Sequence, residues 1–77
     1  MNTMKNRARP YKVNLDLGKK IRRLRNRQKT SQEKLAEKAG IHRTYMGKIE
    51  RGESNPPVHT VSKIAKALGI NIGDLFQ

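Results

Sequence analysis

Apolar residues first recur with a helical period in the segment that follows residue 14. Leu17, Ile21 and Leu24, with Gln28 after them, are spaced by three or four positions, which places them on one face of an α-helix. Asp16 stands where an N-cap or a first-turn acid is expected. The pattern therefore predicts a first helix over about residues 17–28.

The next apolar positions predict a short second helix that ends in a glycine turn. Its start has two candidate caps, because Thr30 with Glu33 fits a capping box and Ser31 is an alternative cap. Gly40 follows it as a C-terminal glycine should. The apolar face of this helix consists of Leu35, Ala36 and Ala39.

A third helix follows directly, over about residues 43–51. Ile41 is an apolar residue in the turn, and His42 occupies the next cap position. The period is carried by Tyr45, Met46 and Ile49, up to Gly52.

The C-terminal part of the chain predicts a loop and two more helices. Residues 53–57 contain two prolines and are expected to be a loop. A fourth helix stops at Gly69, and Asn71 with Asp74 resembles a cap that opens a short fifth helix. The apolar positions of these two helices are Val58, Val61, Ile64, Ala65 and Leu68, then Ile72, Leu75 and Phe76. No segment alternates between apolar and polar residues with the period of two that a strand requires. We therefore expect an all-α fold, a compact five-helix bundle over residues 15–77.

Residues 1–14 differ from the rest and carry much of the charge. They have no helical apolar period and contain Pro10, so we expect a flexible basic arm. The 77 residues hold 18 Lys and Arg against 6 Asp and Glu, a net charge of +12, most of it in the N-terminal third. Such a charge predicts a polyanionic partner. Charge alone does not decide whether this partner is DNA, RNA or an anionic membrane.

Composition excludes several functions. The chain has no cysteine, so disulfide scaffolds and thiolate metal sites are excluded. His42 and His59 lack the spacing of a metal site, and no nucleophilic or phosphate-loop motif is present. No apolar run is long enough for a membrane span. We therefore expect a cytoplasmic protein that is not an enzyme and has no cofactor, no small-molecule ligand and no membrane partner.

Two short helices joined by a glycine turn with a buried apolar residue form a helix-turn-helix. Ala36 must be small because the next helix crosses close to it, and Ile41 fills the angle between the helices. With its flanking segments this region resembles the phage repressor and Cro family, also called the XRE family. The matching segments are 21–25, 31–36, 49–52, 55–56, 64–69 and 74–76.

The resemblance implies that the third helix lies in the major groove of double-stranded DNA. Carried over by position, the side chains that contact base edges are Arg43, Thr44 and Lys48. Arg and Lys suit the acceptors of guanine, and Thr suits the methyl group of thymine. Tyr45 is interpreted either as a DNA contact or as a partly buried ring beside the core.

Other positions are implied to contact the phosphate backbone. Gln32 matches a family glutamine at the start of the second helix that holds a phosphate. Arg51 and Asn55 flank the groove, although Asn55 fits a turn-stabilising role equally well. The arm is expected to add phosphate contacts through Lys5, Arg7, Arg9 and Lys12.

Two positions in the third helix call for a structural interpretation. Glu50 would repel phosphate, and the matching residue of the family pairs with an arginine that corresponds to Arg25. We therefore expect a bidentate Arg25–Glu50 ion pair. Gly47 interrupts the helix, either to let the backbone approach DNA or as a tolerated residue.

We interpret the protein as a sequence-specific transcription regulator, a repressor or activator, that binds a palindromic operator as a homodimer. The interface is expected to include Leu75 and Phe76, which are too apolar for a free terminus. Within the family, residues 43–45 and the lack of an effector domain resemble the controller proteins of restriction–modification systems. RNA polymerase is a further possible partner. Two alternatives stay open: an antitoxin that also binds a toxin, and a basic protein that binds RNA or the nucleoid without sequence preference.

Overall fold

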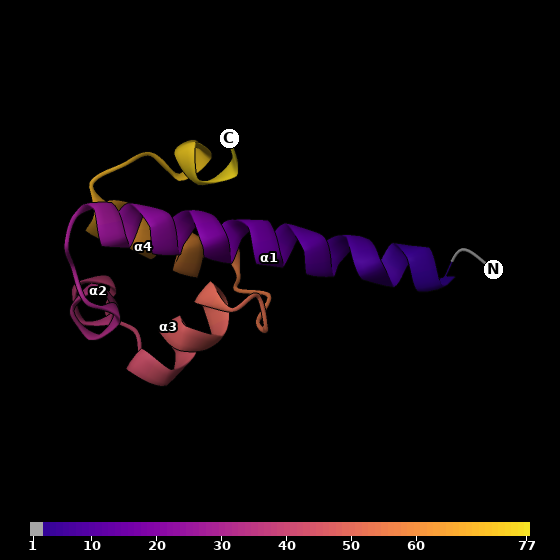
Figure 1. The fold of residues 1–77 in the computed structure, drawn as a ribbon, viewed down its shortest axis with the longest axis horizontal. Coiled ribbons are helices and arrows are strands. Elements are labelled where there is room, and N and C mark those ends of the chain that lie inside the picture. Colours follow the sequence, from indigo (N-terminus) through magenta and orange to yellow (C-terminus); the bar gives the residue numbers. More distant parts are fainter. Residues whose placement is uncertain (1–2) are drawn as a thin grey trace.

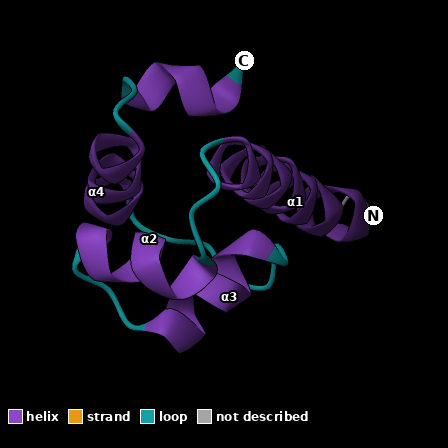
Figure 2. Cartoon of the chain, turned by 60° about the vertical axis from the view of Figure 1, so that its left-hand side comes forward, coloured by secondary structure: helices purple, strands orange, loops and turns teal. Residues whose placement is uncertain are grey.

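Four α-helices and a closing 3₁₀ helix make up the part of the chain that the structure describes. The structure is a computed structural model that describes the backbone of residues 3–77 and the side chains from Lys12 onward. In Figure 1 the long α1 lies between α2 and α3 on one side and η1 on the other, and Figure 2 shows the connecting loops. The elements are α1 (Thr3–Arg27), α2 (Gln32–Ala39), α3 (Arg43–Glu50), α4 (Val58–Leu68) and η1 (Ile72–Phe76). The expected all-α fold is confirmed, but the fifth element is a 3₁₀ helix rather than an α-helix.

The first helix is much longer than its apolar period predicts. It begins at Thr3, so the predicted start near residue 17 is wrong, and a non-helical arm is not found where the backbone is described. Asp16 is not a cap, because it lies inside α1 and pairs with Lys12 one turn earlier (Nζ–Oδ2 3.2 Å). Extending an existing helix costs far less than starting one, and the basic residues here are good helix formers. The apolar period does not extend into this half of α1, which projects past the other helices (Figure 1).

Side-chain caps set the starts of the two helices in the predicted helix-turn-helix. The hydroxyl of Ser31 accepts a hydrogen bond from the backbone N–H of Lys34 (3.0 Å), so Ser31 rather than Thr30 caps α2. His42 caps α3, because its Nδ1 accepts from the N–H of Thr44 (3.0 Å). Gly40 between them has a left-handed backbone, with φ 71°, that a side chain would strain. The predicted caps of this turn are confirmed.

The two C-terminal elements, α4 and η1, begin differently. Pro57 occupies the N-cap of α4 and provides no side-chain hydrogen bond. The backbone N–H of Asn71 donates to Asp74 Oδ2 (3.1 Å), which fixes the start of η1 as the sequence predicts. Gly69 ends α4 in a left-handed conformation.

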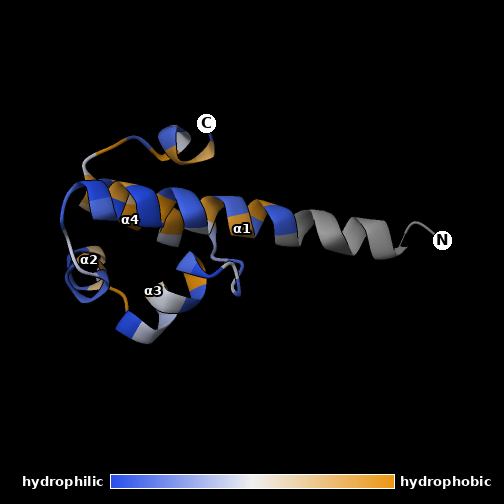
Figure 3. Ribbon diagram, in the orientation of Figure 1, coloured by the Kyte–Doolittle hydropathy of each residue, from blue (hydrophilic) through white to orange (hydrophobic). Residues whose placement is uncertain are grey.

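A single apolar core joins all five elements. Figure 3 shows apolar and hydrophilic positions alternating along α1 and α4, as expected for helices with one buried face. Ile41 is half-buried against this core, as predicted for the residue in the turn. The core consists of Leu17, Ile21, Leu35, Ala36, Ala39, Met46, Ile49, Val61, Ile64, Ala65, Leu68 and Leu75.

Glycine lets α1 approach the end of α3 closely. A Cβ atom on Gly18 would lie 2.5 Å from the carbonyl oxygens of Ile49 and Glu50. Gly52 lies nearby with φ 75°, and a Cβ there would lie 2.6 Å from Leu15 Cδ2. Backbone atoms cannot move aside as a flexible side chain can, so the contact at Gly18 requires glycine.

A buried ion pair fixes the same two helices. Arg25 Nε donates to Glu50 Oε2 (2.7 Å) and Arg25 Nη2 donates to Glu50 Oε1 (3.0 Å), which is the expected bidentate geometry. The side chain of Glu50 is 2% exposed and that of Arg25 is 12% exposed. Arg25 Nη1 also donates to the carbonyl oxygen of Thr30 (2.9 Å), so the pair reaches the turn before α2.

We predict that Gly18→Ala destabilises the fold. Alanine is the better helix former, but its methyl group would force α1 and α3 apart, at a net cost of about 1–3 kcal/mol. Gly73→Ala is the matched control, because nothing lies within 4 Å of a Cβ at that position. Thermal unfolding followed by circular dichroism measures both. A Gly18→Ala protein as stable as wild type would contradict the close approach.

We also predict that Glu50→Ala lowers the Tm strongly. Removing one partner of a buried ion pair leaves the other charge uncompensated, which costs about 3–5 kcal/mol. For a domain of this size, that corresponds to a fall in Tm of more than about 10 °C. The control is Glu53→Ala, which removes an exposed ion pair with Arg51 and should leave the Tm nearly unchanged. Equal effects of the two substitutions would contradict this prediction.

Candidate nucleic-acid interface

Helix α3 has one face in the core and one face in solvent. Its buried residues include Met46 and Ile49, which hold the helix firmly against the rest of the protein. The three side chains predicted to contact bases, Arg43, Thr44 and Lys48, are all exposed. The structure therefore leaves all three of these α3 side chains outside the core.

Tyr45 lies at the border of this surface. Its side chain is half-buried and packs against the apolar core. This placement fits the interpretation of a partly buried ring beside the core, and it leaves part of the ring exposed next to Thr44.

Gln32, at the start of α2, is held by the buried ion pair. Its Nε2 donates to Glu50 Oε1 (3.1 Å), and the residue is half-buried. Glu50 therefore accepts hydrogen bonds from Arg25 and from Gln32 at once. The sequence predicts a DNA contact for Gln32 and a structural role for Glu50, but it contains no signal for the hydrogen bond between them.

Arg51 and Asn55 lie beyond the end of α3, and both are exposed. Arg51 forms a forked pair with Glu53, with Nε–Oε2 2.9 Å and Nη2–Oε1 3.3 Å. The hydrogen bond to Glu53 raises the pKa of Arg51, and the hydrogen bond from Arg51 lowers the pKa of Glu53. Both side chains are about half exposed, so water and salt screen this pair. Glu53 could not be predicted as the partner of Arg51, since a spacing of two residues in a loop is not a recognised pairing pattern.

Of the four basic residues predicted in the arm, the structure describes the side chain of Lys12. Lys12 is exposed and pairs with Asp16, as given above. The side chains of Lys5, Arg7 and Arg9 lie outside the described residues. Their expected phosphate contacts therefore remain a proposal.

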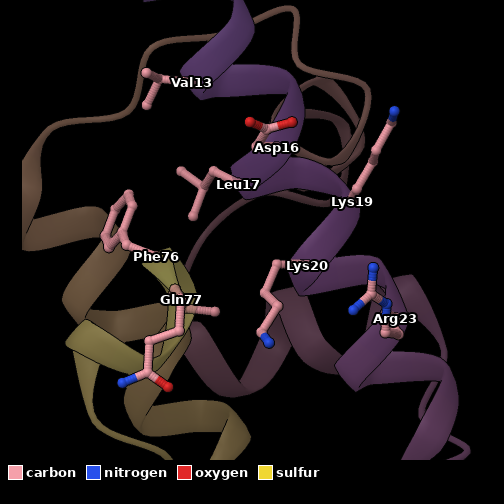
Figure 4. Close-up of a pocket in the computed structure, with 9 residues that line it drawn as sticks. Val13, Asp16, Leu17, Lys19, Lys20, Arg23, Phe76 and Gln77 are labelled. Carbon is pink, nitrogen blue, oxygen red and sulfur yellow. The ribbon is translucent and has the colours of Figure 1, made fainter.

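A pocket lies between α1 and η1 (Figure 4). In Figure 1, η1 lies on the side of α1 away from α3. Val13 and Phe76 flank Leu17 at one end of the pocket, and Lys20 and Arg23 lie at the other. Phe76 is 56% exposed, whereas Leu75 is 2% exposed and belongs to the core of its own chain. Of the two residues expected at a dimer interface, only Phe76 therefore offers a surface.

Metal binding finds no candidate among the described residues. They contain no group of three His, Cys, Asp or Glu side chains that could hold a metal ion. Within the same part of the chain, no helix is long and apolar enough to cross a membrane. Of the two histidines, His42 has a structural role as the cap of α3.

Comparison with known proteins agrees with this geometry. A helix-turn-helix family model matches residues 21–75. The control protein C.BamHI of Bacillus amyloliquefaciens is 44% identical over 66 residues, which is 84% of this chain and 82% of that protein. The control protein C.SmaI of Serratia marcescens is 44% identical over 60 residues, covering 78% and 71% of the two chains. The immunity repressor protein of Bacillus phage phi105 is 40% identical over 58 residues, which is 75% of this chain and 40% of that protein.

A solved structure gives the same result in three dimensions. The restriction–modification controller protein C.AhdI from Aeromonas hydrophila matches with a TM-score of 0.80 at 38% identity, covering 82% of this chain and 96% of that chain. The match thus extends well beyond the two helices of the motif. Because the family model and relatives above 40% identity cover most of the chain, the protein belongs to the XRE-type helix-turn-helix family.

Proposed function

We propose that this protein is a sequence-specific transcription regulator that binds a palindromic DNA operator as a homodimer. The observation that carries the proposal is the arrangement of α3, with Arg43, Thr44 and Lys48 exposed on a helix whose opposite face is buried. Such a helix presents its polar side chains rigidly, as the reading of base edges requires. The match to a helix-turn-helix family model, and the similar proteins that are named control proteins, support a regulatory role. The proposed regulator acts by occupying promoter DNA in the cytoplasm.

The number of recognition helices in one copy supports the proposed dimer. One copy of this fold presents one recognition helix and reads a half-site, so an operator of two half-sites takes two copies with their α3 helices about 34 Å apart. The exposed apolar residues near the C-terminus support a two-fold contact there, with Phe76 at its centre and Val13 beside it. Leu75 would act only indirectly, by holding η1 against the core.

Selection of duplexes from a random pool tests the proposal directly. A two-fold regulator enriches sites with inverted symmetry, and sedimentation of the complex then shows two copies per site. An antitoxin would give the same sites and also capture a toxin. Enrichment of no sequence, or equal binding to RNA, would instead favour a non-specific basic protein and contradict the proposal.

We predict that Arg43→Ala weakens operator binding by about 1–3 kcal/mol and relaxes preference at one base pair of each half-site. Lys63→Ala, which removes one exposed positive charge from α4, is the control and should keep that preference. Titration of the selected operator and of single-base variants of it measures both effects. Equal weakening by Arg43→Ala on operator and random DNA would exclude a base contact.

We also predict that the arm contributes phosphate contacts. Each neutralised phosphate adds about 0.9 to the slope of log affinity against log salt. Deleting residues 2–12 should therefore flatten that slope by about one to four units per subunit, because four basic residues are removed. Sequence preference should change little, since the base-reading residues stay in place. An unaltered slope would indicate an inert tail, and a lost preference would mean that the arm reads bases.

A further inference from the structure

Three basic residues form a stripe on the side of α1 that faces away from α3. Gly18 marks the side of α1 that faces α3, since a Cβ atom there would lie 2.5 Å from backbone carbonyl oxygens of that helix. Each residue turns an α-helix by about 100°, so Lys19, Arg23 and Arg27 are rotated from Gly18 by about 100°, 140° and 180°. All three are exposed, and we call them the basic stripe.

The position of the pocket beside η1 agrees with this geometry. Lys19 and Arg23 line that pocket, and η1 lies on the side of α1 away from α3 in Figure 1. The basic stripe and the exposed face of α3 therefore lie on opposite sides of the protein.

No acidic side chain of the protein neutralises the basic stripe. The described part of the chain holds all six acidic residues and contains three ion pairs, none of which involves Lys19, Arg23 or Arg27. Like charges four residues apart on a helix repel each other, so this arrangement does not stabilise α1. The arrangement suits a partner that supplies the negative charge.

The basic stripe lies too far from the exposed face of α3 to contact the same stretch of DNA. Packed helix axes are about 8–10 Å apart and a helix with its side chains is about 10–12 Å across, which puts the two outward faces about 20 Å apart. The Debye length is about 10 Å at 0.1 M salt. The charges of the stripe therefore contribute little to the binding of a duplex at α3.

We propose that the basic stripe binds the phosphate backbone of a second DNA duplex while α3 holds the operator, so that the protein bridges two segments of DNA. This inference goes beyond the proposed function but rests on it, since α3 must hold the first duplex. Successive residues of the stripe are about 6 Å apart along the helix axis. Such a straight row of cations fits the outside of a duplex, which carries one phosphate charge per about 1.7 Å of its axis.

The composition of the basic stripe favours duplex DNA over two other partners. It has no aromatic residue on which the bases of a single strand would stack. It also has no apolar residue, whereas the centre of a protein interface is apolar. The apolar residues Val13 and Phe76 lie at the other end of the pocket from Arg23, where the contact between two copies is proposed.

A capture experiment tests the bridge. A biotinylated 30-bp operator duplex is held on streptavidin beads, the protein is added at 0.1 M salt, and retention of a fluorescein-labelled 30-bp duplex of random sequence is measured. We expect wild type to retain the second duplex. Combining Lys19→Gln, Arg23→Gln and Arg27→Gln should lower this retention about tenfold or more, because three phosphate contacts per subunit are lost.

The same triple variant separates the second duplex from the first and from stability. Its affinity for the operator alone should stay within about threefold of wild type, since the stripe is screened from that duplex. Its Tm should not fall, because glutamine is a good helix former and the repulsion along α1 is removed. A loss of operator affinity that equals the loss of capture would overturn the proposal.

A matched control removes the same charge from another surface. Lys38, Lys63 and Lys66 are exposed around a separate pocket between α2 and α4. Changing all three to glutamine lowers the net charge equally but leaves the basic stripe intact, so capture of the second duplex should stay close to that of wild type. Equal losses in the two triple variants would mean that net charge alone causes capture, and would overturn the proposal.

The remaining outcomes separate the bridge from the proposed function. A wild-type protein that does not bind the operator beads would overturn both. A protein that binds the beads but captures no second duplex would overturn the bridge alone. Capture that persists without the stripe would do the same, because the α3 of another subunit would then hold the second duplex. If the beads retained labelled poly-glutamate through the stripe and not the duplex, the partner would be an acidic protein and the bridge would again be overturned.

Discussion

The buried carboxylate of Glu50 is the constraint that holds the two helices of the helix-turn-helix in place. It lies on α3, accepts two hydrogen bonds from Arg25 on α1 and one from Gln32 on α2, and is almost fully shielded from water. A buried charge is tolerated only when such partners compensate it. Since each partner comes from a different helix, the position of α3 cannot change without breaking a charged hydrogen bond. The same pairing neutralises the acid, so that it does not oppose the phosphates that α3 is proposed to face.

The central helices could be predicted well from the sequence because local chemistry defines them. Ser31 and His42 cap their helices with their own side chains, and Gly40 provides the left-handed turn between them. The start of α1 could not be predicted in this way. An apolar period reveals where a helix is buried, whereas the first half of α1 is helical without such a period and projects past the other helices in Figure 1.

For the candidate site, the sequence predicted which residues take part, but it could not predict how they are arranged relative to one another. Residues 43, 44 and 48 follow from position on a helix, and their exposure is what the helical period predicts. The bond between Gln32 and Glu50 joins residues far apart in sequence, and the contact of Gly18 with the end of α3 depends on the path of the whole chain. Leu75 shows the converse error, since an apolar residue near a chain end indicates burial but not whether a partner or the same chain buries it.

Because α1 is one continuous helix, the orientation of its N-terminal part depends on the part that packs in the core. The arm and the core share one helix of 25 residues, so a residue inserted between Lys12 and Leu17 would rotate everything before it by about 100° around the helix axis. It would also move the N-terminal end outward by about 1.5 Å. The rotation of the N-terminal part of α1 about the helix axis is thereby fixed relative to Ile21 and Arg25. Among variants of this protein, a length change in that short interval would act as a change of angle, whereas a substitution of Asp16 would act as a change of charge.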